Sequence, residues 1–343
     1  MKFGIGMFGD VTYDFASNSY QNAGERLKEI VEEVKLADEV GIDLFAMGEH
    51  HREDYAVPAP EIILAALAPV TKNIILSSGV NVISSVDPVK LYQDYSMVDL
   101  LSNERAEIMA GRGSFIESFP LFGCDLSDYN ALFEEKLNLL LQIRSNDVVN
   151  WQGKFRPKIE NQTVYPRPNR EIPVWIAVGG TPASVERAGR LGLPIMFAII
   201  GGTMEQFLPL VDYYKQTYAH YGHDSKNMEI GVHSHSFIGK KEWIMAAYYE
   251  RYAHQMDKIG RERGWSGRYS RMQFENGMDL HGALFMGEPE QVAEKIIHTV
   301  ELFGLTRFVA HLDIGGPHHR DMMQCIELYG TKVLPIVRKH FES

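Results

Sequence analysis

Polar residues with catalytic chemistry follow one of the short apolar segments of this chain. The apolar run 44–47 leads into Gly48-Glu49-His50-His51, in which a carboxylate precedes two imidazoles. These groups are suited to general acid–base catalysis or to metal binding. Neighbouring residues on a strand point to opposite faces, so Glu49 and His50 can serve one site only if the strand ends before them. A solvated polar loop is the alternative interpretation.

Two other turns are suited to binding an anion such as a phosphate. After the run 106–110, Arg112 and Ser114 stand beside glycines, and a guanidinium matches the oxygens of a phosphate. The second turn opens a helix, whose free N–H groups and dipole attract anions. Its residues are Gly179, Gly180, Thr181, Pro182, Ala183 and Ser184. Similar glycine pairs at 201–202 and 315–316 leave open which turn would bind the anion.

Histidines on one strand face offer a different chemistry. In the run 228–238, His233 and His235 are two residues apart and therefore share a face. Together with His311 and Glu49 they could ligate a metal ion, which keeps a metal-dependent barrel hydrolase as an alternative. Such hydrolases usually carry a His-x-His pair on the first strand, and the run 3–8 has no histidine. We therefore expect no metal.

Eight short apolar runs, most of them followed by a segment of helical periodicity, organise the whole chain. Parallel strands need crossover helices, so this alternation predicts an α/β fold, a (β/α)8 TIM barrel with insertions after strands 4 and 7. The predicted strands are 3–8, 44–47, 74–82, 106–110, 174–178, 195–200, 228–238 and 307–312. The predicted helices include 25–40, 61–70, 88–101, 129–143, 182–191 and 204–221. In such barrels functional residues lie at the C-terminal strand ends, where the candidates above stand.

Two longer segments interrupt the alternation. Residues 151–173 are polar and rich in proline, and residues 243–286 hold an extra helix and an arginine-rich stretch. We expect both to be insertions in a single domain that spans 1–343. The second follows the seventh strand and would form a lid at the C-terminal mouth of the barrel.

Composition excludes several classes of partner. The chain has 45 Asp and Glu against 34 Lys and Arg, a formal charge of −11, so we expect neither nucleic acid nor a membrane as partner. No stretch approaches the ~20 apolar residues that cross a bilayer, and the first residues lack the features of a signal peptide. Cys124 and Cys325 form no spacing pattern and are expected to stay reduced. We expect a cytoplasmic protein.

The order of these motifs resembles that of the bacterial luciferase-like flavin-dependent monooxygenases, over essentially the whole chain. Individually the motifs are short, and their succession along one barrel carries the resemblance. They are 48–51 after the second strand, Gly79-Val80 after the third, Gly111-Arg112-Gly113 with Phe122-Gly123 after the fourth, 177–186 after the fifth, and 285–293 before the last helices.

The resemblance implies a two-component monooxygenase. Reduced FMN, a cosubstrate supplied by a separate NAD(P)H-dependent flavin reductase, would react with O2 to a flavin hydroperoxide that oxidises a small organic substrate. His50 would be the catalytic histidine, and Glu49 the carboxylate near the flavin ring. The implied cofactor-binding residues are Gly79, Val80, Arg112, Ser114, Val178, Gly179, Gly180, Thr181 and Ser184. The family also implies a cis peptide between Gly79 and Val80 and a homodimer.

Three positions depart from luciferase itself. Gly111 stands where luciferase has a cysteine, so we expect no bioluminescence, and Asn130 stands near a second phosphate-binding arginine. Gly180 replaces an acidic residue that other members of the family also lack. Two alternatives stay open within the same fold. One is a deazaflavin-dependent enzyme that transfers hydride without oxygen, and the other is a non-catalytic flavin-binding protein.

Overall fold

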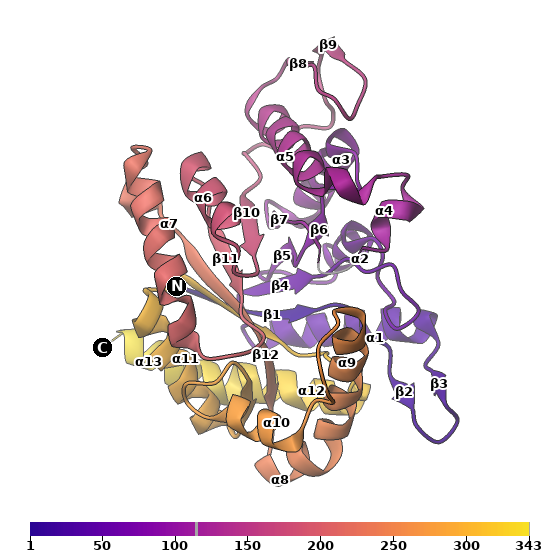
Figure 1. Cartoon of the computed structure of the whole chain (residues 1–343), viewed down its shortest axis with the longest axis vertical. Helices are drawn as coiled ribbons and strands as arrows, with labels where there is room; N and C mark the ends of the chain where they lie inside the picture. The colour runs from indigo at the N-terminus through magenta and orange to yellow at the C-terminus, as the bar shows by residue number, and fades with distance from the viewer. Residues whose placement is uncertain (114–115, 343) are drawn as a thin grey trace.

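Eight parallel strands close into a barrel in the computed structural model, which describes residues 1–113 and 116–342 (Figure 1). In order around the barrel they are β1 (Lys2–Met7), β4 (Leu44–Met47), β5 (Ile75–Ser78), β7 (Ala106–Gly111), β10 (Val174–Val178), β11 (Ile195–Ala198), β12 (Ile230–Ile238) and β14 (Arg307–His311). The pairing of β14 with β1 closes the ring. The predicted (β/α)8 barrel is confirmed.

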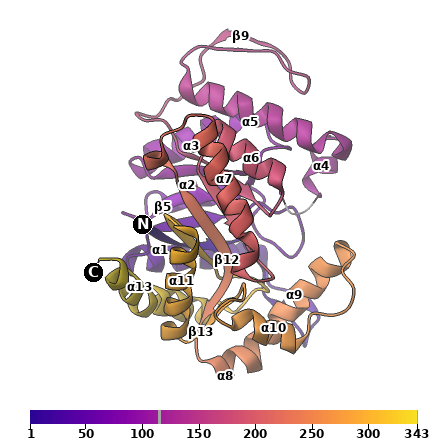
Figure 2. The ribbon, with the colours of Figure 1, turned by 60° about the vertical axis from the view of Figure 1, so that its left-hand side comes forward.

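Helices cover the outside of this barrel (Figures 1 and 2). They are α1 (Ala23–Glu39), α2 (Pro60–Leu67), α3 (Pro88–Ser102), α5 (Tyr129–Ser145), α6 (Pro182–Leu191), α7 (Leu208–His220), α11 (Pro289–Phe303), α12 (His319–Leu328) and α13 (Leu334–Glu342). Asn22 and Asp87 accept N–H bonds from the first turns of α1 and α3, and Gly192 and Gly304 end α6 and α11 in the left-handed conformation. None of the described helices is long and apolar enough to cross a membrane.

The inner faces of the strands fill the barrel in layers. Along β14, Arg307, Val309 and His311 are two residues apart and all are buried. At the lowest level Arg307 forms an ion pair with Glu107 of β7, and its guanidinium lies 3.9 Å from the centre of the Trp175 ring. An apolar layer follows, made of Leu44, Ala46, Met109, Trp175, Met196 and Val309. Above it, histidines replace apolar side chains and mark the mouth.

Residues 151–173 take part in an antiparallel hairpin beside α5 rather than an irregular loop. Its strands are β8 (Val149–Trp151) and β9 (Ile159–Gln162), which project from the barrel in Figure 1. The prediction of a polar, proline-rich segment missed this hairpin, because its strands are short and have only one buried residue each. Other short elements are β2 (Tyr13–Asp14), β3 (Ser19–Tyr20), β6 (Asn81–Val82), α4 (Ser118–Leu121), η1 (Leu126–Asp128), η3 (Ser225–Asn227) and η5 (Tyr329–Val333).

Residues 243–286 form several helices beside the C-terminal end of β12 (Figure 2). They are α8 (Lys241–Trp243), η4 (Ile244–Tyr248), α9 (Tyr249–Glu262) and α10 (Arg271–Met278). The segment returns through β13 (Phe285–Gly287), a strand that the sequence analysis missed and that pairs in parallel with β12. The predicted helix 204–221 is two elements, η2 (Met204–Phe207) and α7, because a capping box between Thr203 and Gln206 starts its own turn.

Candidate functional site

Two adjoining cavities open at the C-terminal ends of the barrel strands. One has a volume of about 340 Å³ and the other about 890 Å³. They share five wall residues, namely Phe8, Gly179, Ala198, His233 and Arg263. The side chains at this boundary therefore contact both spaces.

The smaller cavity brings together most of the residues singled out in the sequence. Its wall contains Glu49, His50, Gly79, Val80, Arg112, Val178, Gly179, Thr181 and Ser184. Gly180 adjoins this wall without lining the cavity, and Ser114 lies outside the described residues. The predicted strand 74–82 is interrupted here, because the Gly79–Val80 peptide is cis, as the family resemblance implied, and separates β5 from β6.

Glu49 is held in place by its neighbours at the edge of this cavity. Its Oε1 lies 2.9 Å from His51 Nε2, and its Oε2 accepts a hydrogen bond of 2.8 Å from the backbone N–H of Val82. The carboxylate is buried. The strand ends at Met47, which resolves how Glu49 and the next residue, His50, can both line one wall.

His50 packs between two aromatic rings. The Tyr55 ring stacks on it at 4.3 Å, and the Phe8 ring meets it edge-on at 4.5 Å. Burial lowers the pKa of His50 to about 3. The imidazole is therefore neutral near pH 7, with one nitrogen that donates a proton and one that accepts.

The opposite end of the smaller cavity is suited to an anion. The Arg112 guanidinium lies 5.0 Å from the centre of the Tyr129 ring and donates a hydrogen bond of 2.6 Å to Asn130 Oδ1. Asn130 thus positions the Arg112 guanidinium.

The first turn of α6 faces the same end. The Thr181 hydroxyl makes no capping bond to the helix, and the Ser184 side chain is buried in the cavity wall. Beside Gly179 there is open space, since an added Cβ would meet nothing within 4 Å, and Gly180 has a φ of +113° that favours glycine. An arginine, hydroxyl groups and a helix N-terminus are groups suited to binding a phosphate.

The larger cavity has a mostly apolar wall. Aromatic and aliphatic side chains come from both the barrel and the 243–286 segment. They include Phe207, Met256, Ile259, Trp265, Tyr269 and Leu284. The polar exceptions are grouped at the barrel end, where His233, His235 and His311 meet the cavity. This space suits an organic molecule with a largely apolar body.

A chain of buried polar groups runs from the cavity boundary into the barrel. His233 Nε2 and His311 Nδ1 are 2.9 Å apart, and His311 Nε2 lies 3.2 Å from Asp313 Oδ1. Burial alone would raise the pKa of Asp313, but His311 and the positive charge of Arg26 hold it below the ordinary value. Burial lowers the pKa of His233, so a neutral His233 is backed by an ionised carboxylate.

The position of Asp313 is fixed by the start of the chain. Its carboxylate accepts backbone N–H bonds of 2.9 Å from Phe8 and 2.8 Å from Gly9. A negative charge near His311 Nε2 favours a proton on that nitrogen, which leaves Nδ1 to accept from His233 Nε2. The remaining nitrogen of His233, Nδ1, is then the one that can accept a proton.

The sequence analysis missed Asp313 and its link to the histidines. The signal was present, because Asp313 stands just after the eighth strand, where the same strand-end rule applies. Gly6 was a second signal, because a Cβ on that residue of β1 would lie 2.5 Å from His233 Nε2. Glycine there leaves room for the ring.

The four-residue metal set considered from the sequence is not assembled. Among the described residues, three groups bring ligand atoms within 4.8 Å of one another, and none includes Glu49, His233 or His235. The hydrogen bonds explain this separation, since Glu49 is engaged with His51 and Val82, whereas His235 Nδ1 lies 2.8 Å from the Tyr252 hydroxyl.

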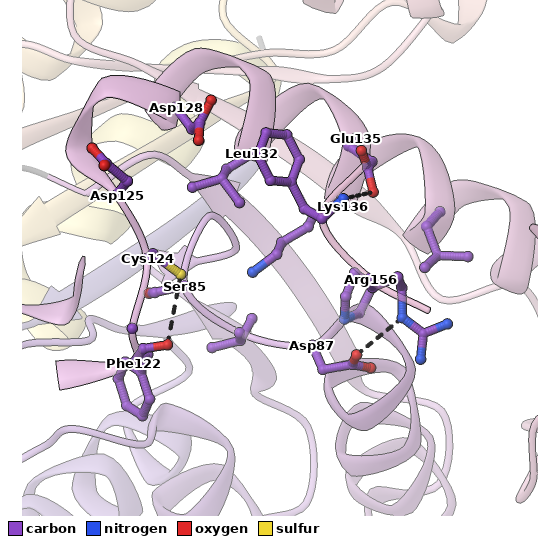
Figure 3. A pocket seen from close by; sticks show the side chains of 15 residues that line it. Ser85, Asp87, Phe122, Cys124, Asp125, Asp128, Leu132, Glu135, Lys136 and Arg156 are labelled. Carbon is purple, nitrogen blue, oxygen red and sulfur yellow. Dashed lines mark hydrogen bonds and ion pairs between the residues drawn. The ribbon is translucent and has the colours of Figure 1, made fainter. Parts of the chain in front are cut away.

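A further cavity of about 430 Å³ lies between the loop before α3 and the first turns of α5 (Figure 3). It contains none of the predicted catalytic or cofactor-binding residues, although Phe122 and Gly123 of the motif after the fourth strand lie in its wall. Arg156 Nε pairs with Asp87 at 3.2 Å, as Figure 3 shows. Lys136 Nζ donates to the carbonyl of Ser84 at 2.8 Å.

Comparison with known proteins relates this chain to a protein family. The family model described as luciferase-like monooxygenase matches residues 1–307. The alkanal monooxygenase alpha chain of Photorhabdus luminescens is 22% identical over 344 residues, which cover 93% of this chain and 94% of that protein.

Solved structures share the fold. The monooxygenase RslO1 of Streptomyces bottropensis has a TM-score of 0.82 at 23% identity and covers 98% of this chain and 99% of its own. The oxygenating constituent of 3,6-diketocamphane monooxygenase from Pseudomonas putida, solved with FMN, has 0.76 at 18% identity, with 98% of each chain covered. The coenzyme F420-dependent tetrahydromethanopterin reductase of Methanopyrus kandleri has 0.73 at 18% identity and covers 97% and 98%.

Proposed function

The chain belongs to the luciferase-like monooxygenase family, and from this premise we propose that it is an FMNH2-dependent monooxygenase acting on a small, largely apolar organic compound. The family holds flavin-dependent monooxygenases and F420-dependent oxidoreductases. One observation carries this proposal. The smaller cavity, whose wall suits a phosphate, adjoins the mostly apolar larger cavity at Phe8 and His233.

The residues of the smaller cavity fit a flavin mononucleotide. Arg112, Thr181, Ser184 and the first N–H groups of α6 would hold the phosphate, and the Gly79–Val80 wall would contact the ring. When bound, reduced FMN supplies the two electrons and the oxygen-activating chemistry. One atom of O2 then enters the substrate and the other leaves as water.

The protein's own groups would manage protons and water. The neutral His50 can hold or release a proton at the flavin side, and His233, positioned by His311 and Asp313, can accept one at the boundary with the substrate. The 243–286 segment provides much of the apolar wall and would keep bulk water from the reacting atoms.

We also propose two protein partners. A separate NAD(P)H-dependent reductase would supply the reduced flavin, as in two-component members of this family. A second copy of the chain would pair through α2 and α3, where Ile62, Met97 and Leu101 are each more than half exposed. Light scattering of the purified protein tests the pairing, and a Leu101→Glu variant should shift it toward monomer.

The decisive experiment is an anaerobic titration of the full chain with reduced FMN and, separately, with reduced F420. We expect reduced FMN to bind more tightly than oxidised FMN and than reduced F420. Isotopically labelled O2, supplied with a panel of apolar carbonyl and thioether compounds, should then label one product. Preferential binding of F420 would replace the proposal with hydride transfer, and binding without any labelled product would favour a flavin carrier.

A further inference from the structure

A second group of side chains with metal-binding chemistry lies at the rim of the larger cavity. Glu205 belongs to η2, His281 follows α10, and His298 belongs to α11. One ligand atom from each lies within 4.8 Å of the other two. His281 also lines the larger cavity, so this group stands where the 243–286 segment meets the barrel.

One nitrogen of this group lacks a hydrogen-bond partner. His281 Nδ1 bonds to Glu205 Oε1, and His298 Nε2 lies 3.7 Å from the same oxygen. His298 Nε2 is shielded from solvent and has no hydrogen-bond partner. A shielded polar atom without a partner is unfavourable, and a cation between the three side chains would satisfy it.

We propose that Glu205, His281 and His298 bind a divalent transition-metal ion, for which Zn²⁺ is the best match. Two imidazoles and one carboxylate are a common zinc ligand set, and three protein ligands leave one tetrahedral position for water. Imidazole nitrogen also disfavours Mg²⁺ and Ca²⁺, which prefer sites made of oxygen.

The other two groups with ligand atoms in reach have a cation already. In the group of Glu29, Glu33 and His319, Arg26 pairs with Glu33 at 2.8 Å. In the group of Asp10, His311 and Asp313, the same arginine lies 3.6 Å from Asp313. Among the described residues, no lysine or arginine pairs with Glu205, so its charge is left for a metal.

A metal here would tie the 243–286 segment to the barrel rim. The backbone already makes one connection, because Met204 donates to the carbonyl of His281 and Thr203 forms a β-bridge with Gly282. Coordination would add side chains from η2 and α11 to the same point. Metal binding should therefore fix the end of α10 and limit opening of the larger cavity at this side.

The test is a calorimetric titration of the EDTA-treated full chain with Zn²⁺. We expect one site in the wild type and at least about 100-fold weaker binding in His298→Ala, because loss of even a supporting residue weakens metal binding by about 10- to 100-fold. His319→Ala, which removes the histidine of another carboxylate group, is the matched control and should bind like the wild type. If His298→Ala fails to fold, Glu205→Gln takes its place.

A second readout follows the segment itself. Zn²⁺ should slow proteolytic cleavage within residues 260–282 in the wild type and in His319→Ala, but not in His298→Ala. Equal Zn²⁺ binding by the wild type and His298→Ala, or no binding by either, would overturn the site. Binding without protection would overturn the link to the cavity rim. None of these readouts involves a flavin, so they are independent of the proposed function.

Discussion

At the scale of single residues, the mouth of the barrel is organised around Phe8. Its ring lies 4.5 Å from that of His50 and 4.0 Å from that of His311, and 6.3 Å from that of His233. Phe8 therefore keeps the two proposed proton-transfer groups, His50 and His233, apart with an apolar surface. Each can hold a proton independently of the other.

Arg112 gives the most direct test of the proposed phosphate-binding residues. Arg112→Ala should weaken FMN binding by about 2–3 kcal/mol, because a charge-assisted contact to the phosphate is lost, and should leave riboflavin binding unchanged. Fluorescence titration with both ligands measures this. Arg156→Ala, in the separate cavity of Figure 3, is the control and should bind FMN like the wild type. Equal losses for FMN and riboflavin would contradict the assigned role.

His50 should separate binding from chemistry. His50→Ala should still bind reduced FMN, because the proposed phosphate-binding residues are intact, and should lose substrate oxidation by about 100-fold or more if the imidazole transfers a proton. Binding is followed anaerobically and oxidation by labelled product. A variant with normal oxidation would remove His50 from the mechanism.

Buried histidines should make the fold sensitive to acid. Burial lowers the pKa values of His50, His233 and His235, so the unfolded chain binds more protons than the folded one below pH 6.5. The stability that these neutral histidines contribute is therefore present above pH 6.5 and is lost as the pH falls. Each of these histidines should lower the free energy of unfolding by about 2 kcal/mol between pH 6.5 and pH 5.

A single substitution isolates one of these contributions. His235→Gln has no group that titrates in this range, so urea denaturation should show it losing about 2 kcal/mol less than the wild type between pH 7.5 and pH 5. The same pH dependence in both proteins would show that His235 is not held neutral by the fold.

Strand-end position explains which site residues the sequence could predict. His50, Arg112 and Thr181 directly follow strands whose apolar runs are clear, and they line the predicted mouth. Asp313 follows a strand equally directly, but its role depends on backbone N–H groups at Phe8 and Gly9, some 300 residues away. Such a contact depends on barrel closure and has no local signal.

At the scale of elements, Lys295 of α11 anchors the 243–286 segment. Its buried Nζ donates to the carbonyls of Gly277, Asp279 and Leu284, at 3.0, 2.6 and 2.8 Å. Three carbonyls at the end of α10 and in the chain that follows thus share the Lys295 side-chain nitrogen. This contact ties the segment to α11.

Removal of the Lys295 amino group should loosen the 243–286 segment. Lys295→Met should lower the free energy of unfolding by about 2 kcal/mol or more, because carbonyl groups lose their donor in a buried place. Limited proteolysis should show faster cleavage within residues 260–282. Lys332→Met, at an exposed lysine of η5, should behave like the wild type in both assays. Unchanged cleavage in Lys295→Met would contradict the anchoring role.

Elements with a clear apolar pattern were predicted well, and short elements without one were not. The helix 182–191 and the strand 174–178 have the predicted bounds, because apolar spacing, a proline start and a glycine stop agree with one another. The four-residue strand β4 was predicted because all its residues are apolar, whereas β8 and β9 have one buried residue each and β13 has only three residues. Their pairing depends on neighbours that the local sequence does not reveal.

At the scale of the whole molecule, the Arg307–Glu107 pair closes the lower end of the barrel. Arg307→Met should destabilise the protein by about 3–5 kcal/mol, because it leaves Glu107 as a buried charge without a partner. Arg307→Met/Glu107→Gln should recover most of that loss. Urea denaturation of the three proteins measures both changes. Equal stability of the single and double variants would show that the pair is not coupled.

The pairing of β1 with β14 also affects how the chain folds during its synthesis. Roughly 300 residues separate these two strands, so at ~5–20 residues per second a ribosome needs about 15–60 seconds to deliver the second after the first. During that interval β1 has β4 on one side and an unpaired edge on the other. The nascent half-barrel is thus the stage at which the chain would most need a chaperone.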